Sequence, residues 1–328
     1  MGQHSAEGSV MDGSALAVDL GGTNVRAALV TSSGVIRYHV AQPTRANEGP
    51  DAVIDRIVAL VEDVIVHEKP APEVLLGVAA PGPINPHTGV LYFAPNLPGW
   101  RNVKLRDILV QQLQRRVVVG NDGNAAALGE AMFGAGQHYR HVIYIGLGTG
   151  VGGGIVIDGR VIDGVHGLGG EVGHIPVDIN GPRCHCGGIG CIEAYAGGWA
   201  IARDGRILVR SERSAAIQKA ALDGPITAEA VAKAAAGGDP AAKAVFERAG
   251  WALGVGLAGL VNVFNPELIV IGGGLAAAGD LILDTVRETL PRYAMRQIYP
   301  DVTVVRSTLG TRTGILGAAA LVFQTETA

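Results

Sequence analysis

Apolar and polar residues alternate in blocks along the chain, and the spacing within each block predicts strands, helices and turns. Residues 15–36 contain an apolar strand, a Gly-Gly-Thr turn, a second strand and, after Ser-Ser-Gly, the start of a third. Apolar residues at helical spacing follow over 51–66, where Asp51 is a candidate N-cap and two prolines come after the helix. A short apolar strand at 74–80 comes next. This order of strands, helix and strand predicts an α/β domain.

The same pattern returns at residues 142–157, where two apolar strands flank a second glycine turn. An offset of 127 positions places Asp19-Leu20-Gly21 over Gly146-Leu147-Gly148. Later, a helical pattern over 244–264 leads to a buried strand at 267–271 and a third glycine turn. This weak internal repeat predicts two related α/β domains that face each other across a cleft and are joined by a hinge.

The predicted domain organisation has four parts, since 328 residues exceed one ordinary core. We expect a disordered leader at 1–14, a small α/β domain at 15–120, a large α/β domain at 121–310 that contains the cysteines, and a closing helix at 311–328 that returns to the first domain.

Charge and hydropathy exclude some partners. The chain has 26 basic and 30 acidic residues, a net charge of -4 and no block of like charges, which argues against nucleic acid or an anionic membrane surface. The most apolar stretch, 249–261, is too short to span a bilayer. Three clustered cysteines without a secretory signal indicate a reducing cytoplasm.

The glycine turns are candidate phosphate sites. The sequences DLGGTN at 19–24 and GTGVGGG at 148–154 place small residues and Thr at strand ends, so backbone N–H groups and hydroxyls can face an anion. Asp19, which ends an apolar strand, is suited to a hydrated Mg2+. Neither turn is a P-loop, and each alone could be an ordinary hairpin or bulge; two matching turns at one offset favour phosphate binding. The third turn, at 272–274, is either a close approach to adenosine or a tight strand-to-helix turn.

All three cysteines lie within CHCGGIGCIE at 184–193, with a histidine ten residues before the first. The predicted ligands of a structural, four-coordinate zinc are His174, Cys184, Cys186 and Cys191. The alternative is a set of free buried thiols. A zinc here would hold a glycine-rich loop and fix Glu171, His174 and Glu193 around a ligand rich in hydroxyls.

Asp122 is the candidate general base. It lies in NDGNAAALGE at 121–130, after the apolar strand RVVVG, at a predicted strand-to-helix junction where a carboxylate can point into a cleft. Simple N-capping is the alternative. If phosphate lies on one side and a polyol on the other, Asp122 could accept the proton of the attacking hydroxyl.

Eight motifs occur in the order expected of one family: DLGGTN, APGP, PNLPGW, NDGNAA, GLGTGVGGG, GEVGH, CHCGGIGCIE and IVIGGG. Together they resemble the repressor, open reading frame, kinase (ROK) family, and within it the bacterial glucokinases, over roughly residues 15–322. The cysteine box with its upstream E-x-G-H is the most specific of these motifs. Gly123 departs from the pattern, where alanine is commoner.

The resemblance implies a two-domain α/β fold of the actin-like, hexokinase type (ribonuclease H-like), with a deep interdomain cleft. It implies γ-phosphoryl transfer from ATP, with Mg2+, to the 6-hydroxyl of a hexose such as glucose. Asp122 would be the base. The sugar-binding residues would be Asn96, Asn121, Asp122, Glu171, His174 and Glu193. Those around Mg2+ and the nucleotide would be Asp19, Gly21, Gly22, Thr23, Asn24, Gly148, Thr149, Gly150, Gly273 and Gly274.

Several alternatives stay open from the sequence. The sugar could be mannose, N-acetylmannosamine, fructose or allose, polyphosphate could replace ATP, and the protein could be a sugar sensor without turnover. The family's repressors carry an N-terminal helix-turn-helix, for which the 14 residues before the first strand leave no room. The resemblance also implies homodimers or homotetramers.

Overall fold

The computed structural model describes residues 13–222, 224–275 and 280–326, which form two compact units. Unit 1 comprises the chain up to Asp122 and from Gly314 onward, and unit 2 comprises Gly123–Thr313. Most of the expected leader, residues 1–12, lies outside the described residues. Its predicted end at residue 14 is wrong, because Ser14 already pairs with Thr31 in the first sheet.

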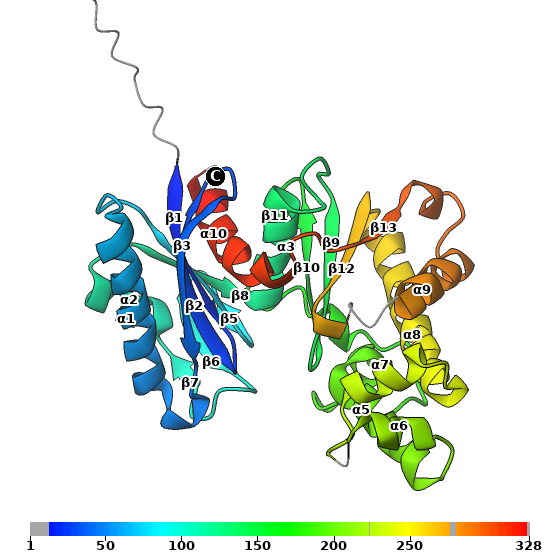
Figure 1. Ribbon diagram of the computed structural model, residues 1–328. Coiled ribbons are helices and arrows are strands. Elements are labelled where there is room, and N and C mark those ends of the chain that lie inside the picture. Colours follow the sequence, from blue (N-terminus) through cyan, green and yellow to red (C-terminus); the bar gives the residue numbers. More distant parts are fainter. Residues whose placement is uncertain (1–12, 223, 276–279, 327–328) are drawn as a thin grey trace, which may run out of the picture. The chain divides into compact units, whose positions relative to one another are not determined.

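Unit 1 is built on a five-stranded sheet in the order β3-β2-β1-β4-β8. The strands are β1 (Ser14–Leu20), β2 (Asn24–Thr31), β3 (Ile36–Pro43), β4 (Leu76–Ala80) and β8 (Val117–Asn121). The first three are antiparallel neighbours, whereas β4 and β8 run parallel to β1. Figure 1 shows a smaller three-stranded sheet in the same unit, made of β5 (Ile84–Asn85), β6 (Val90–Phe93) and β7 (Arg101–Val103).

The helices of unit 1 are η1 (Ala46–Glu48), α1 (Pro50–Glu68), α2 (Leu105–Leu113) and α10 (Thr313–Glu326). The prediction that Asp51 caps α1 is wrong: Gly49 occupies the N-cap with a positive φ, Pro50 opens the helix, and Asp51 lies in its first turn. The predicted closing helix is α10, which packs so closely on β4 that a Cβ at Gly77 would overlap the carbonyl of Ala318.

Unit 2 repeats this sheet. Its order is β11-β10-β9-β12-β13, and again two antiparallel pairs are followed by two parallel ones. The strands are β9 (Val142–Leu147), β10 (Val151–Ile157), β11 (Arg160–Val161), β12 (Leu268–Gly272) and β13 (Thr303–Arg306). The internal repeat at an offset of 127 residues therefore reflects a real repetition of topology, and the predicted α/β fold class is confirmed.

The helical segments of unit 2 are α3 (Asp122–Phe133, which starts at the boundary), η2 (Val172–His174), α4 (Glu193–Ala196), α5 (Gly198–Arg210), α6 (Ala215–Ala220), α7 (Ala228–Ala236), α8 (Pro240–Phe264), α9 (Asp280–Tyr293), η4 (Tyr299–Asp301) and η5 (Gly310–Arg312). At 25 residues, α8 is longer than the apolar stretch counted in the sequence and, among the described residues, is the helix that could cross a membrane by length and composition. Of its most apolar window, 67% is buried, as in a core helix.

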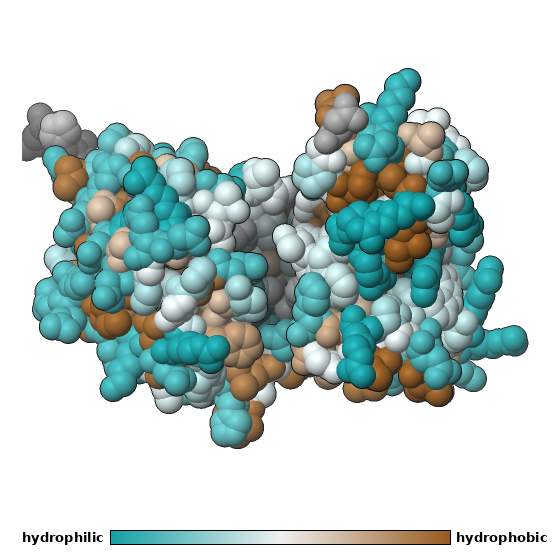
Figure 2. All heavy atoms as spheres, turned by 90° about the horizontal axis from the view of Figure 1, so that it is seen from below, coloured by the Kyte–Doolittle hydropathy of each residue, from teal (hydrophilic) through white to brown (hydrophobic). Residues whose placement is uncertain are grey.

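Exposed apolar side chains do not gather into one large area on the face shown in Figure 2, where they lie in small groups between hydrophilic ones. The most exposed of the large ones are Val66, Val165, Ile179, Leu222 and Val263. Such scattered residues are normal on a protein surface.

Candidate functional site

In unit 1, the candidate residues lie at the carboxyl end of the sheet, where three parallel strands end. Asp19 is near the end of β1, and its carboxylate lies 3.4 Å from the guanidinium of Arg26 on β2. Burial raises the pKa of Asp19, and the positive charge of Arg26 opposes this only in part. Asp19 is therefore a desolvated carboxylate, which gains from a cation that binds beside it.

The N-terminal end of α10 meets Asp19 directly. Gly314 is the second residue of this helix, and a Cβ there would overlap the Asp19 carboxylate. Only glycine lets the helix end approach the acid so closely. The first turn of a helix also offers backbone N–H groups and positive potential to an anion.

The first glycine turn packs against the predicted sugar-binding loop. The N–H of Gly21 donates to the carbonyl of Asn24 at 2.9 Å, and the hydroxyl of Thr44 donates to the Gly21 carbonyl at 2.6 Å. A Cβ at Gly22 would lie 2.9 Å from Cβ of Asn96, so the absence of a side chain admits the loop. Thr23 and Asn24 are exposed at the tip.

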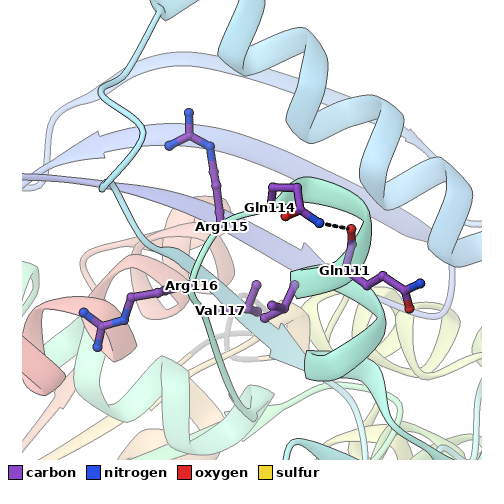
Figure 3. Close-up of a pocket in the computed structure, with 6 residues that line it drawn as sticks. Gln111, Gln114, Arg115, Arg116 and Val117 are labelled. Atoms are coloured by element: carbon purple, nitrogen blue, oxygen red, sulfur yellow. Dashed lines mark hydrogen bonds between the residues drawn. The ribbon is translucent and has the colours of Figure 1, made fainter.

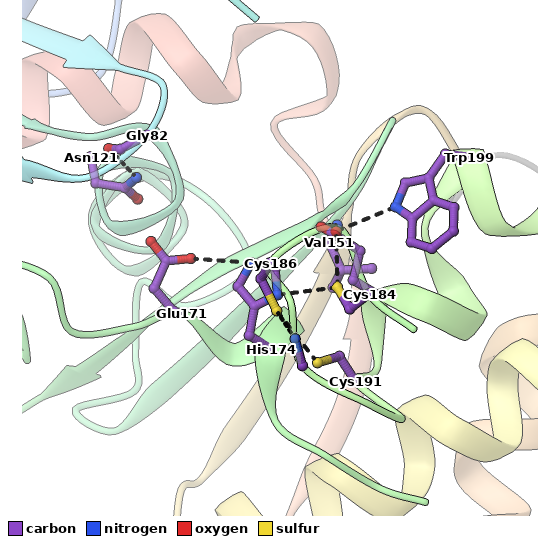
Figure 4. A network of polar contacts seen from close by, with 11 residues as sticks. Gly82, Asn121, Val151, Glu171, His174, Cys184, Cys186, Cys191 and Trp199 are labelled. Carbon is purple, nitrogen blue, oxygen red and sulfur yellow. Dashed lines mark hydrogen bonds and ion pairs between the residues drawn. The ribbon is translucent and has the colours of Figure 1, made fainter. Parts of the chain in front are cut away.

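Asn121 and Asp122 follow at the end of β8. The amide of Asn121 donates to the carbonyl of Gly82, in the turn that follows β4, at 3.1 Å (Figure 4). Asp122 is exposed and is the first residue of α3. The predicted strand-to-helix junction is confirmed. Asp19, Asn121 and Asp122 thus lie at one end of one sheet, the usual place for ligands in α/β folds.

In unit 2, the second and third glycine turns lie side by side at the carboxyl ends of β9 and β12. Gly148 donates its N–H to the carbonyl of Gly150 at 3.0 Å, and Thr149 is exposed. Gly273 has a φ of 89°, and a Cβ there would overlap the backbone of Leu147. The tight turn explains Gly273 structurally. At Gly274, a Cβ would meet no atom of the described residues within 4 Å.

The predicted metal ligands converge. The donor atoms of His174, Cys184, Cys186 and Cys191 all lie within 4.8 Å of one another (Figure 4). Sγ of Cys184 is 3.6 Å from Nδ1 of His174, and Sγ of Cys186 is 3.8 Å from Sγ of Cys191. A tetrahedral zinc with ordinary bond lengths separates two sulfurs by about 3.8 Å and a sulfur and nitrogen by about 3.6 Å. The two measured distances between donor atoms therefore match those expected in a tetrahedral zinc site.

The loop around the thiols contains glycines in a backbone conformation that other residues rarely adopt, and it has few regular backbone pairs. Gly190 has a φ of 69°, and a Cβ there would overlap the carbonyl of Asp178. Tyr195 donates its hydroxyl to Asp178 at 2.7 Å from the other side. Burial raises the pKa of the Cys184 thiol to about 12, so ionisation of this thiol requires a nearby cation. This donor set fits zinc.

Two carboxylates lie beside the cluster. Nε2 of His174 is 3.9 Å from Glu171, so the ring can ligate a metal through Nδ1 while its other nitrogen faces a carboxylate. Desolvation raises the pKa of Glu171, the interaction with His174 opposes this increase, and the neighbouring Glu193 adds to it.

Glu193, the first residue of α4, connects the cysteine loop to the second glycine turn. Its Oε2 accepts from the N–H of Val151 at 3.0 Å, and a Cβ at Gly150 would overlap it. Its Oε1 accepts from the indole N–H of Trp199 at 3.3 Å.

The predicted site residues thus fall into two groups. Unit 1 holds Asp19, Gly21, Gly22, Thr23, Asn24, Asn96, Asn121 and Asp122, and unit 2 holds Gly148, Thr149, Gly150, Glu171, His174, Cys184, Cys186, Cys191, Glu193, Gly273 and Gly274. Sequence reasoning missed Gly314 and Trp199. A glycine near the start of the closing helix was the signal available for Gly314.

A surface pocket elsewhere in unit 1 contains none of these residues. It is lined by Val110, Gln111, Gln114, Arg115, Arg116 and Val117 (Figure 3). The guanidinium of Arg115 donates to the carbonyls of Ala71 and Pro72 at 2.7 and 3.1 Å. Arg115 therefore ties the loop after α1 to the entry of β8, which is a structural role.

Comparisons with known proteins agree with these motifs. The profile of the ROK family matches residues 15–325. The chain is 39% identical to a glucokinase of Thermotoga maritima over 309 residues, which cover 94% of this chain and 96% of that protein.

Two solved structures are similar over nearly the whole chain. A ROK hexokinase from Thermus thermophilus has a TM-score of 0.83 and 32% identity, with 96% of this chain and 100% of that chain covered. A ROK family glucokinase from Streptomyces griseus, in complex with glucose and AMPPNP, has a TM-score of 0.80 and 36% identity, with 95% and 100% covered. The chain belongs to the ROK family.

Proposed function

We propose that this protein is an ATP-dependent glucokinase, which transfers the γ-phosphoryl group of ATP to the 6-hydroxyl of glucose. One observation carries the proposal: an exposed aspartate, Asp122, opens a helix at the carboxyl end of a parallel strand. The similarity to a glucokinase whose structure contains glucose and AMPPNP supports it over 95% of the chain.

Asp122 acts as the general base in this proposal. Its carboxylate accepts the proton of the 6-hydroxyl as that oxygen attacks the γ-phosphorus and the bond from phosphorus to the β,γ-bridging oxygen of ATP breaks. Asn121 precedes it and is held by Gly82, so the backbone that carries the base is fixed before the sugar binds.

The sugar hydroxyls are bound by Asn96, Asn121, Glu171, His174 and Glu193. These side chains accept and donate hydrogen bonds, as a polyol requires. A zinc held by His174 and the three cysteines would offset most of the negative charge of the thiolates and keep the loop in one conformation. Nε2 of His174 would then donate to the sugar or to Glu171, because Nδ1 is used by the metal.

The phosphates and Mg2+ are bound by the strand ends. Asp19 has a desolvated carboxylate, which would hold a hydrated Mg2+, and the cation would supply positive charge to the phosphates. The turns at 21–24 and 148–150 offer backbone N–H groups and threonine hydroxyls to the phosphate oxygens. The similarity to a ROK family glucokinase in complex with AMPPNP supports a nucleotide rather than polyphosphate as donor. Because the enzyme consumes ATP, we place it in the cytoplasm; dimers or tetramers stay a prediction, which the mass in solution tests.

The test is ADP release by the purified protein with Mg-ATP and a panel of sugars: glucose, mannose, fructose, allose and N-acetylmannosamine. We expect the highest kcat/KM with glucose. A higher value with another hexose would change the substrate and keep the reaction. Turnover with polyphosphate but not ATP would change the donor, and glucose binding without turnover from either donor would favour a sugar sensor.

A further inference from the structure

Trp199 is fixed by its backbone against the second glycine turn. It is the second residue of α5, and its N–H donates to the carbonyl of Thr149 at 3.1 Å. The N–H of the preceding Gly198 donates to the carbonyl of Gly148 at 3.0 Å. The start of α5 therefore cannot shift without moving this turn.

The indole ring is also held by its neighbours. The ring of His185 stacks on it with centroids 4.0 Å apart and an angle of 20° between the planes. The guanidinium carbon of Arg203 lies 5.4 Å from the ring centroid, and Arg203 is itself bonded to the carbonyl of Ala194 at 3.1 Å. His185 lies in the sequence between two predicted zinc ligands, so the metal loop supports the ring.

The indole N–H is directed at Glu193, whose Oε1 it meets at 3.3 Å. The other side chain near Oε1 is Cys184, whose Sγ is 3.6 Å away. With zinc bound, Cys184 is a thiolate and has no proton to donate. Trp199 is then the side chain, among the contacts that the structure describes, that donates to Oε1.

Charge makes this donor more important. Three thiolates outweigh the two positive charges of zinc, so the occupied cluster is negative and repels the nearby Glu193 carboxylate. The N–H of Val151 holds Oε2, but one hydrogen bond does not fix rotation of the carboxylate about its terminal bond. A second donor on Oε1 sets the plane of the group.

We propose that Trp199 is a positioning residue that orients Glu193 for the sugar. This inference rests on the proposed function, because it assumes that Glu193 binds a hexose hydroxyl. Through the Thr149 contact, the same residue links the sugar-binding carboxylate to the second phosphate turn.

The test variant is Trp199→Phe, which keeps an aromatic ring for His185 and removes the N–H. We expect KM for glucose to increase about 10-fold, as for a lost hydrogen bond to a charged group, while kcat, KM for ATP and zinc content stay within about twofold of wild type. The matched control is Trp251→Phe on α8, where the ring meets Tyr195 edge-on with centroids 6.1 Å apart, and KM should not change.

A double-mutant cycle separates positioning from structure. In a Glu193→Ala background, Trp199→Phe should have no further effect on KM for glucose or on glucose binding by calorimetry. His185→Ala, which keeps the N–H donor, should increase KM by only about twofold.

Three outcomes overturn the inference: unchanged KM in Trp199→Phe, the same increase in KM with and without Glu193, or loss of zinc and kcat together. If the wild-type protein neither binds nor phosphorylates glucose, the proposed function fails instead. The two failures are therefore distinguishable.

Discussion

The two sheets have the same strand order but position their functional groups by different means. In unit 1, carboxylates and amides come directly from strand ends, and ordinary packing fixes them: Arg26 and Gly314 enclose Asp19, and Gly82 holds Asn121. In unit 2, the polar groups lie on or beside a glycine-rich loop that is not part of a sheet. Side-chain contacts position them instead: the Cys/His cluster brings parts of the loop together, and Trp199 donates a hydrogen bond to Glu193.

This difference follows from local backbone support. Strand pairing fixes the backbone of a residue at the end of a strand, whereas a loop with several glycines has no such support. The zinc proposed for the Cys/His cluster would supply to unit 2 the support that unit 1 obtains from its strands. The comparison predicts that changes in unit 1 act on chemistry, and that changes in the zinc loop act on stability and sugar affinity together.

The largest expected effect is on unit 1. Asp122→Asn should lower kcat at least 100-fold, because the amide cannot accept the hydroxyl proton, while glucose affinity by calorimetry changes little. Steady-state kinetics measure this. Near-normal turnover would show that Asp122 is not the general base and that its role is only structural, at the start of α3.

The next largest effect is expected in unit 2, where a change should alter stability and glucose affinity together. Cys186→Ser should abolish stoichiometric zinc, lower Tm by more than about 5 °C and weaken glucose binding, because the loop loses its cross-link. Zinc content, calorimetry and thermal denaturation measure these three quantities. A variant without zinc that keeps full glucose affinity would show that the metal does not organise the sugar groups.

A smaller effect is expected where helix α10 meets Asp19. Gly314→Ala should force the carboxylate aside and increase the Mg2+ concentration for half-maximal rate about 10-fold. The control is Gly259→Ala in α8, where a Cβ meets nothing within 4 Å and the Mg2+ requirement should not change. Equal Mg2+ dependence in both variants would contradict a role for this close approach.

The smallest effect concerns pH and stability. Because the pKa of Asp19 is raised in the folded state, the folded protein binds this proton more tightly than the unfolded chain. An aspartate in the unfolded chain has a pKa of about 3.9. As the pH rises from this value past the higher pKa of folded Asp19, the free energy of unfolding decreases, and this loss persists at neutral pH. Without Mg2+ or nucleotide, Asp19→Asn should restore the lost free energy of unfolding. Tm at pH 7 should rise by about 2–4 °C for each kcal/mol of stability that is restored. A lower Tm at pH 7 would show that the contact with Arg26 outweighs burial.

The sequence by itself determined the features that lie close together along the chain. The hairpins with glycine tips, the helix from 51, the junction at Asp122 and the cluster of three cysteines depend on neighbouring residues, which fix local backbone geometry and metal spacing. The start of α1 shows the limit of this approach: Gly49, not Asp51, occupies the N-cap.

Only the tertiary structure decided which distant groups meet. Gly314 reaches Asp19 because α10 packs on β4, and Ser307 reaches the buried Glu130 across 177 positions of sequence. Trp199 reaches Glu193 because α5 begins at the second glycine turn. Periodicity tells which face of a helix is apolar but not which residue opposes it, since that depends on how whole elements pack.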